Sequence, residues 1–262
     1  MLSFNLEGKT ALIGGSTQGL GLASAEALAS LGASCVLISR NEEKLKQAVA
    51  GLKKIHGLQH QYLVADYQYP EQVGQVVADF VKDHPIHILV NNSGGPAGGP
   101  IKDALPEAFL AAFQQHLICN HILTRLVVPG MQQEEYGRII NIISTSVKIP
   151  LKDLGVSNTI RAAVAGWAKS MANELGKFGI TVNNVLPGAT STERLETIIN
   201  NKAMKTGADH DAIEAEMLKE IPMGRFGKPE EIAAMVAFLA SPAAAYVNGT
   251  SIPVDGGRTG SI

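Results

Sequence analysis

The chain has 262 residues, of which 45% are hydrophobic, and a formal net charge of -2. This length suits one large α/β domain better than two small ones, and the hydrophobic fraction is sufficient to cover both faces of a sheet. Lysine and arginine are scattered along the chain, so we expect no nucleic-acid surface and no membrane-binding stripe.

The lack of long apolar runs argues against a membrane-spanning protein, and the positions of the two cysteines argue against a cysteine metal site. No run approaches the roughly 18 residues of a transmembrane helix, and the start MLSFNLEGK lacks a signal-peptide core, so we expect a cytoplasmic protein. Cys35 falls in a predicted strand and Cys119 in a predicted helix, without metal-ligand spacing. Two buried free thiols and no metal site are therefore expected.

Strand and helix patterns alternate from end to end. The predicted strands lie near 9–14, 34–39, 60–65, 86–91, 137–143, 180–186 and 250–254. The predicted helices lie near 19–31, 41–55, 70–83, 106–133, 157–177 and 228–240. This alternation predicts an α/β fold: a single-domain, Rossmann-like, doubly wound parallel β-sheet of about seven strands with helices on both faces. Ligands of such sheets bind outside the carboxyl ends of the strands, so the residues that follow each strand are the functional candidates.

The stretch KTALIGGSTQGLGLASAEALASL (9–31) reads as a strand, a glycine turn and a helix. Glycines at 15, 19 and 21 permit positive φ and close approach of a ligand, while the first N–H groups of a helix favour an anion. The spacing G-x3-G-x-G differs from the G-x-G-x-x-G dinucleotide fingerprint. The stretch is therefore either a phosphate cradle or a turn that merely connects strand to helix.

The next two strands end in residues that bear on the adenosine half of a nucleotide. SCVLIS ends at Arg40, where an acidic residue would bind the ribose hydroxyls of NAD. The guanidinium of Arg40 suits the 2′-phosphate of NADP(H) instead, although a solvated arginine at the start of a helix is the alternative. After the third strand, Asp66 and Tyr67 are placed to meet the adenine or to form a plain turn.

The fourth strand runs into the small residues NNSGGP (91–96), which let the backbone pass close beside a flat ligand. Five further motifs are recognisable in the chain: GGSTQGLG (14–21), GRIINIIS (137–144), ITVNNVLPG (180–188), PMGRFGKPEEIA (222–233) and VDGG (254–257). With them the chain resembles the short-chain dehydrogenase/reductase family over nearly all its residues. It is most similar to the 3-oxoacyl-[acyl-carrier-protein] reductase-like members.

The resemblance implies a site for NADP(H), preferred over NAD(H). The residues that it places at the cofactor are Gly15, Ser16, Thr17, Gly19, Leu20, Gly21, Arg40, Asp66, Tyr67, Asn92, Gly94, Pro187, Gly188, Thr190 and Thr192. For the last two, a turn and a helix N-cap are the alternative roles, and both can hold together. Gly14 stands where the family usually has Thr, and Ser93 where it usually has Ala. The resemblance also implies one domain (1–262), a substrate lid over 189–221 and a homotetramer.

The catalytic pattern of the family is altered in this chain. Members that reduce carbonyls use Asn, Ser, Tyr and Lys, with Tyr and Lys at i and i+4 on one helix face. The Ser is kept as Ser144, while Ser157, Arg161 and His116 occupy the Tyr, Lys and Asn positions. A serine hydroxyl is a much weaker acid than a phenol, and arginine stays protonated and planar. Arg161 could therefore hold NADPH or an anionic substrate, but it is not an equivalent lysine.

The proton donor remains open. His116 has an ordinary pKa near 6.5, which suits the task, although the resemblance places it behind the site, where the family Asn holds a water. Lys148, Lys152 and Asp153 could turn inward from the loop before Ser157, although surface charges are common on loops.

These features predict an NADP(H)-dependent oxidoreductase of a carbonyl or alcohol substrate, such as a small molecule or a 3-oxoacyl thioester, with a non-standard proton relay. Two alternatives remain from the same residues. One is an NADP(H)-binding regulatory or structural protein without turnover. The other is a dehydratase or isomerase on the same fold.

Overall fold

The computed structural model describes residues 2–53 and 58–261. One seven-stranded sheet has the order β3-β2-β1-β4-β5-β6-β7, and every neighbouring pair is parallel. The strands are β1 (Thr10–Gly14), β2 (Ser34–Ser39), β3 (Gln61–Val64), β4 (Ile88–Asn91), β5 (Gly137–Ile142), β6 (Ile180–Pro187) and β7 (Ser251–Val254). The helices are α1 (Gly19–Ser30), α2 (Glu42–Gly51), α3 (Pro70–Phe80), α4 (Pro106–Phe113), α5 (Cys119–Gln133), α6 (Gly155–Leu175), α7 (Glu193–Thr206), α8 (His210–Lys219) and α9 (Pro229–Ala240).

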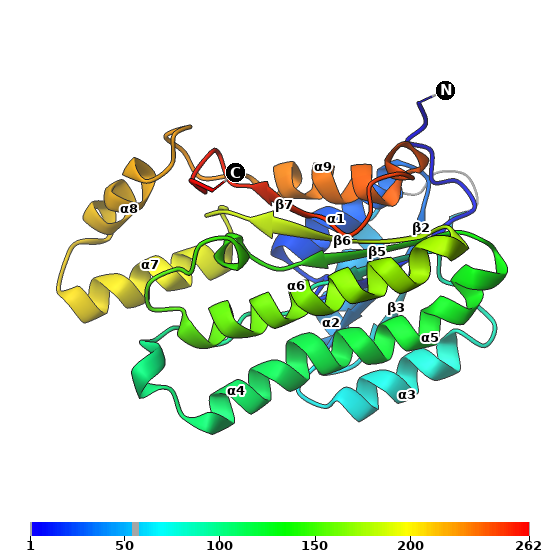
Figure 1. Cartoon of the computed structure of the whole chain (residues 1–262), viewed down its shortest axis with the longest axis horizontal. Coiled ribbons are helices and arrows are strands. Elements are labelled where there is room, and N and C mark those ends of the chain that lie inside the picture. The colour runs from blue at the N-terminus through cyan, green and yellow to red at the C-terminus, as the bar shows by residue number, and fades with distance from the viewer. Residues whose placement is uncertain (1, 54–57, 262) are drawn as a thin grey trace.

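Helices cover both faces of this sheet, with α1 and α9 on one side and α3 to α6 on the other (Figure 1). Side chains alternate along each strand, so each face has its own hydrophobic core. On β1, Ala11 and Ile13 pack in the core under α1, α2 and α9, whereas Leu12 packs in the core under α3, α5 and α6. All three are fully buried, as expected of a parallel sheet covered on both faces.

The order of the strands reverses at β1. This strand pairs with β2 on one side and with β4 on the other, while β3 and β5 lie farther out. The crossovers on the two sides therefore leave a crevice outside the carboxyl ends of β1 and β4, which is where open α/β sheets bind ligands. The loops after β1, β4, β5 and β6 all meet at this edge.

The elements agree with the sequence predictions in kind, with differences at a few boundaries. All seven predicted strands are present. The helix predicted over 106–133 is divided into α4 and α5 by a π-helical turn, Gln114–Ile118. The helix predicted over 41–55 ends at Gly51 as α2, and the last part of that prediction, 54–55, lies outside the described residues.

The polar segment 189–221 contains two helices, α7 and α8, which lie past the carboxyl ends of β6 and β7 (Figure 1). A small hydrophobic cluster holds the two helices together, with Leu195 and Ile199 from α7 and Ile213 from α8 buried in it. This segment is therefore a packed unit beside the ligand-binding edge of the sheet.

Two expectations about chemistry outside the site can be compared with the structure. Cys35 and Cys119 are both buried and free, as predicted. Burial raises the pKa of each thiol to about 12, so both are unreactive at neutral pH. Among the helices of the described residues, none has the length and apolar character needed to cross a membrane.

Candidate functional site

The turn from β1 into α1 needs glycine at several positions. Gly15 and Gly19 have φ of 55° and 56°, in the left-handed region. A Cβ at Gly21 would overlap the carbonyl oxygen of Gly15 and lie 2.8 Å from Nδ2 of Asn92. The start of α1 carries no side-chain cap and no acidic residue, so its first N–H groups and positive dipole end are left for an anion. Thr17 and Leu20 of the same turn are half-buried.

Hydrogen bonds fix this glycine turn to the neighbouring strands. Nδ2 of Asn92 donates to the carbonyl oxygens of Gly14 and Gly15 at 3.1 and 3.3 Å. The fully buried Ser16 donates to the carbonyl of Ile38 in β2 at 3.4 Å. The turn is therefore held in one conformation by the chain itself, which lowers the entropic cost of binding a ligand there.

Arg40 and Asp66 lie at the ends of β2 and β3. The side chain of Arg40 is 71% exposed and its Nη1 lies 3.9 Å from Oδ2 of Asp66. Asn41, the next residue, accepts the N–H of Lys44 and caps α2. An open recess at this edge is lined in part by Arg40, Asp66 and Tyr69. The geometry leaves the guanidinium of Arg40 accessible to a ligand in this recess.

Tyr67 lies under the glycine turn rather than at the ligand edge. Its side chain is 7% exposed within the core, and its hydroxyl has no hydrogen-bond partner among the described residues. A Cβ at Gly14 would overlap this hydroxyl, so the glycine that replaces the usual family Thr leaves room for the phenol. The Tyr67 side chain points into the core, and the contact of Asp66 and Tyr67 with the adenine stays a prediction.

Ser144 directly follows β5, and Ser157 and Arg161 lie on α6, which Arg161 joins to the carboxyl end of β5. Oγ of Ser144 accepts the N–H of Ser146 at 3.1 Å. Ser157 and Arg161 lie four residues apart in α6 and therefore on one face of that helix. Arg161 is 9% exposed, and its Nη1 donates to the carbonyl of Ile142 at 3.0 Å. This bond joins α6 to β5 two residues before Ser144.

His116 lies in the π-helical turn between α4 and α5, a kind of distortion often found at functional sites. Its Nδ1 is 2.7 Å from Oγ of Ser93, so two residues that depart from the family pattern contact each other. Burial, and secondly the charge of Arg161, lower the pKa of His116 to about 2. The imidazole is therefore neutral at physiological pH. The expectation that it donates a proton at its ordinary pKa is corrected, because this burial removes the charged form.

The other candidates for the missing acid are equally unsuited. Lys148, Lys152 and Asp153 are exposed side chains of the loop before α6. Each tyrosine of the chain lies in the described residues, and each has another environment. Tyr62 bonds Glu42, Tyr67 is in the core, Tyr136 donates to the carbonyl of Ala240, and Tyr69 and Tyr246 are surface residues. No phenol in the described structure has taken over the position of Ser157.

The segment after β6 has a well-defined turn. Pro187 ends the strand, and a Cβ at Gly188 would lie 2.6 Å from the Cβ of Asp255. The buried Thr190 donates to the carbonyl of Gly188 at 3.1 Å, and Thr192 is the N-cap of α7. These turn and capping bonds leave the nicotinamide-facing role of the two threonines as a prediction.

Arg194, in the first turn of α7, is a site residue that the sequence reasoning missed. Its Nη2 donates to the carbonyl of Pro96, in the loop after β4, at 2.7 Å. Nη2 of Arg194 and Nη2 of Arg161 lie 3.6 and 3.8 Å from the position of a Cβ on Gly95. Burial, and secondly the charge of Arg194, lower the pKa of Arg161 to about 10. Two guanidinium groups therefore converge over the loop at the end of β4.

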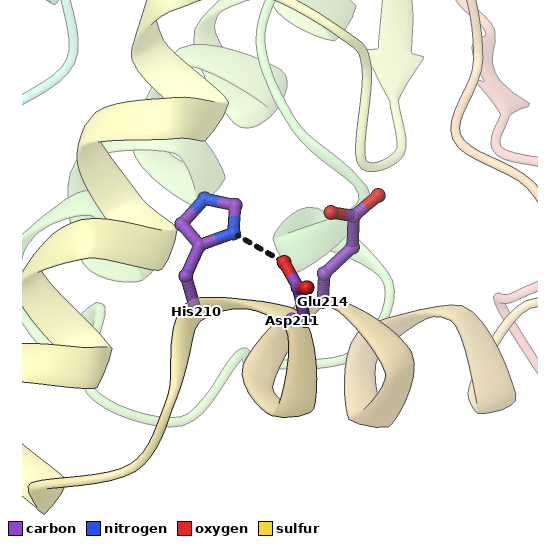
Figure 2. A group of neighbouring side chains, drawn as sticks. All are labelled: His210, Asp211 and Glu214. Carbon is purple, nitrogen blue, oxygen red and sulfur yellow. Dashed lines mark ion pairs between the residues drawn. The ribbon is translucent and has the colours of Figure 1, made fainter.

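A second group of titratable side chains lies in the segment 189–221, where His210, Asp211 and Glu214 begin α8 (Figure 2). Their ligand atoms lie within 4.8 Å of one another. Nε2 of His210 is also 3.3 Å from Oε2 of Glu196 in α7, and the Asp211 side chain is 92% exposed. These charge pairs connect α7 to α8 at the surface, and no metal role is derived from them.

A doubly wound sheet with an open glycine turn at its reversal point defines a dinucleotide-binding class of α/β protein. Residues 15–259 match the family described as Enoyl-(Acyl carrier protein) reductase. The chain is 35% identical to the 3-oxoacyl-[acyl-carrier-protein] reductase FabG of Vibrio cholerae, over 97% of this chain and 98% of that protein. The chain belongs to the short-chain dehydrogenase/reductase family of oxidoreductases and resembles its 3-oxoacyl-[acyl-carrier-protein] reductase members.

Solved structures agree with this assignment. L-Sorbose reductase from Gluconobacter frateurii, complexed with NADPH and L-sorbose, is 32% identical, with a TM-score of 0.92 and 99% of each chain covered. YwfH, an NADPH-dependent reductase involved in bacilysin biosynthesis, is 30% identical, with a TM-score of 0.90 and coverage of 97% of this chain and 99% of that one.

Proposed function

We propose that the chain is an NADP(H)-dependent oxidoreductase that interconverts a carbonyl and an alcohol. The observation that carries this proposal is the position of an open, glycine-built anion cradle at the same sheet edge as Ser144, Ser157 and Arg161. Its similarity to L-sorbose reductase, which was crystallised with NADPH, supports the choice of cofactor.

The residues of this edge fit a dinucleotide. The uncapped N-terminus of α1 would hold the pyrophosphate, because its N–H groups and dipole are not neutralised by an acidic first turn. Asn92 and Gly94 would lie beside the adenosine ribose, and the segment from Pro187 to Thr192 beside the carboxamide. When bound, the reduced nicotinamide supplies a hydride.

Arg40 supports NADP(H) over NAD(H). Its guanidinium is exposed, and the only ion pair recorded for it within the described residues is the long one with Asp66. A 2′-phosphate in the adjoining recess would replace that pair with charge-assisted hydrogen bonds, which are about twice as strong as neutral ones. NAD(H) has no 2′-phosphate and would therefore not form these hydrogen bonds with Arg40.

Reduction adds a hydride to the carbonyl carbon, moves the π electron pair to oxygen and then requires a proton on that oxygen. Because Oγ of Ser144 accepts the Ser146 N–H, the Ser144 hydroxyl hydrogen can point to the carbonyl oxygen. Ser157 is too weak an acid to be the source of the proton. It relays a proton from water instead, and the charge of Arg161 stabilises the negative oxygen until the proton arrives.

The test is a screen of NADPH oxidation with a panel of ketones, oxo acids and 3-oxoacyl thioesters, following loss of NADPH absorbance. We expect steady turnover with at least one class and a loss of about 100-fold in kcat for Ser144→Ala. NADPH binding without turnover on the whole panel would contradict the proposal in favour of a regulatory or structural protein. Absence of any NADPH-induced rise in Tm would favour a dehydratase or isomerase.

The finer points of assembly and substrate are part of the same proposal. A homotetramer is expected from the family resemblance, and light scattering on the purified chain tests it. The packed pair α7 and α8 would act as the lid over the bound substrate, since Arg194 joins α7 to the loop after β4.

A further inference from the structure

We propose that Arg161 and Arg194 form a carboxylate-binding site, and that the substrate is a short oxo acid or the corresponding hydroxy acid. This inference rests on the oxidoreductase function proposed above and narrows its substrate class. The carboxylate would lie over Gly95, between the two guanidinium groups, and within one or two carbons of the carbon that exchanges the hydride.

The first step is the geometry of the two arginines. One comes from α6 and the other from α7, yet their Nη2 atoms lie within 4 Å of one point, 3.8 and 3.6 Å from a Cβ position on Gly95. That point is one bond length from the Cα of Gly95, so it marks where the two guanidinium groups converge and is not itself a place for a ligand atom. With no side chain on Gly95 to separate them, the two guanidinium groups can both donate to one carboxylate that lies beside the glycine.

The second step is the number of donors still available. Nη1 of Arg161 donates a hydrogen bond to the carbonyl of Ile142, and Nη2 of Arg194 donates one to the carbonyl of Pro96. Nε of Arg161 is buried without a partner among the described residues. A buried donor without an acceptor is unfavourable, and an anionic ligand would satisfy it.

The third step is charge. No ion pair in residues 2–53 and 58–261 involves either arginine. Two like charges repel each other more strongly where one of them is desolvated, and Arg161 is 9% exposed. His116 packs near Arg161 but is neutral, so it does not balance this charge. A carboxylate would relieve the repulsion and offset the desolvation of Arg161.

The fourth step is the distance from the reacting carbon. Arg161 lies four residues from Ser157 on the same face of α6 and is bonded to β5 two residues before Ser144. A carboxylate on Arg161 is therefore beside the group being reduced. The hydride and proton are added to the carbonyl, and the carboxylate is unchanged. A thioester at this position has no negative charge to offer, so the site favours free acids.

The experiment compares an acid with a neutral analogue of the same length on the full chain loaded with NADP⁺. The probes are 2-oxohexanoate and its methyl ester, and calorimetric titration measures their Kd. We expect the acid to bind at least about tenfold more tightly than the ester, since charge-assisted bonds to two arginines carry the difference. Equal affinity of the two probes, or no binding of either, would overturn the proposal.

Variants then show whether the arginines cause the preference. Arg194→Gln changes an exposed side chain and is expected to weaken acid binding about tenfold, while leaving NADP⁺ affinity within about threefold. Gly95→Ala keeps both arginines but places a methyl group between them, and should weaken acid binding similarly. Arg125→Gln, on exposed α5 surface, is the matched control and should change neither. A loss of NADP⁺ affinity rather than acid affinity in Arg194→Gln would contradict the assignment.

Failure of the underlying function has a different outcome. If the chain does not bind NADP⁺, the same titrations are made without nucleotide. Acid binding that Arg194→Gln weakens would then retain the carboxylate site on a protein that is not an oxidoreductase. Acid binding that is absent, or insensitive to Arg194→Gln and Gly95→Ala, would overturn the site itself.

Discussion

The proposed cofactor edge and the proposed reaction centre of this protein differ in how far they keep the family pattern. At the glycine turn, backbone geometry dictates the residues: positive φ at Gly15 and Gly19, and no space at Gly21. At the proposed reaction centre the requirement is for side-chain chemistry, and the family resemblance puts Ser157 and Arg161 where a phenol and an amine are usual. Backbone requirements allow few substitutes, whereas a side-chain role can be transferred or exchanged.

Two of the departures from the family pattern contact each other, and two others contact residues of the same region. Ser93 and His116 are hydrogen-bonded, and the space left by Gly14 is filled by the phenol of Tyr67. Arg161 converges with Arg194 over Gly95. The contact of Ser93 with His116 is expected if the two exchanges compensate each other, so we interpret the reaction centre as rebuilt for another substrate.

The largest predicted effect breaks the cofactor edge itself. Gly21→Val would force side-chain atoms into the carbonyl of Gly15 and the amide of Asn92, both parts of the turn. We expect NADPH affinity to fall by at least about 100-fold, because the phosphate cradle can no longer form. NADPH fluorescence titration measures this. Circular dichroism checks that the fold is kept, and unchanged affinity in a folded variant would show that the nucleotide binds elsewhere.

The second prediction tests the role of Arg40 at the adenosine end of the proposed cofactor site. Arg40→Ala should raise the Kd for NADPH by about tenfold to 100-fold and leave the Kd for NADH within about threefold, since only NADPH has a 2′-phosphate. Both constants come from the same titration. Arg225→Ala is the control, because that arginine pairs with Glu231 at 2.6 Å, away from the glycine turn. An equal increase in Kd for both nucleotides would mean that Arg40 does not bind the 2′-phosphate.

The third prediction concerns the packing under the turn. Gly14→Ala should destabilise the fold by about 1–3 kcal/mol, because its Cβ overlaps the hydroxyl of Tyr67 and lies 2.6 Å from the carbonyl oxygen of Asn92. The cost should be smaller in a Tyr67→Phe background, where the hydroxyl is removed. Denaturant unfolding of the four proteins gives the coupling. The same cost in both backgrounds would show that the two positions are independent.

The smallest predicted effect is on the pH dependence of kcat. A nearly constant kcat would distinguish this reaction centre from one in which a phenol titrates. The pKa of His116 is about 2 and that of Arg161 about 10, so neither changes charge between about pH 5 and about pH 9. We expect kcat to vary by less than about threefold in that range. Above it, activity should fall as Arg161 loses its proton. A bell-shaped profile centred near neutrality would reveal an acid or base outside this account.

Much of the fold could be predicted because its signals are local. Alternating strand and helix patterns gave the seven strands, and glycine spacing gave the turn at Gly15 and Gly19. The π-helical turn at His116 was not predictable, because a continuous helical pattern runs through it. The inward orientation of Tyr67 depends on the space left by Gly14, which is a tertiary property.

The candidate site also has residues that the sequence could locate and properties that only the folded chain shows. Ser144, Ser157 and Arg161 could be located by counting along family motifs, since the strand and helix fix their spacing. The pKa of His116 could not, because it depends on burial. Arg194 gave no local signal either. It contacts Pro96 across 98 residues of sequence, and only the folded chain brings α7 to the loop after β4.

The central claim is that an intact NADP(H) site serves a reaction centre without a phenol. The most direct measurement is titration of the purified chain with NADPH and separately with NADH, following cofactor fluorescence and Tm. We predict saturable NADPH binding that raises Tm, with NADH at least about tenfold weaker. If neither nucleotide binds or raises Tm, the glycine turn has been kept for another purpose and the oxidoreductase assignment is contradicted.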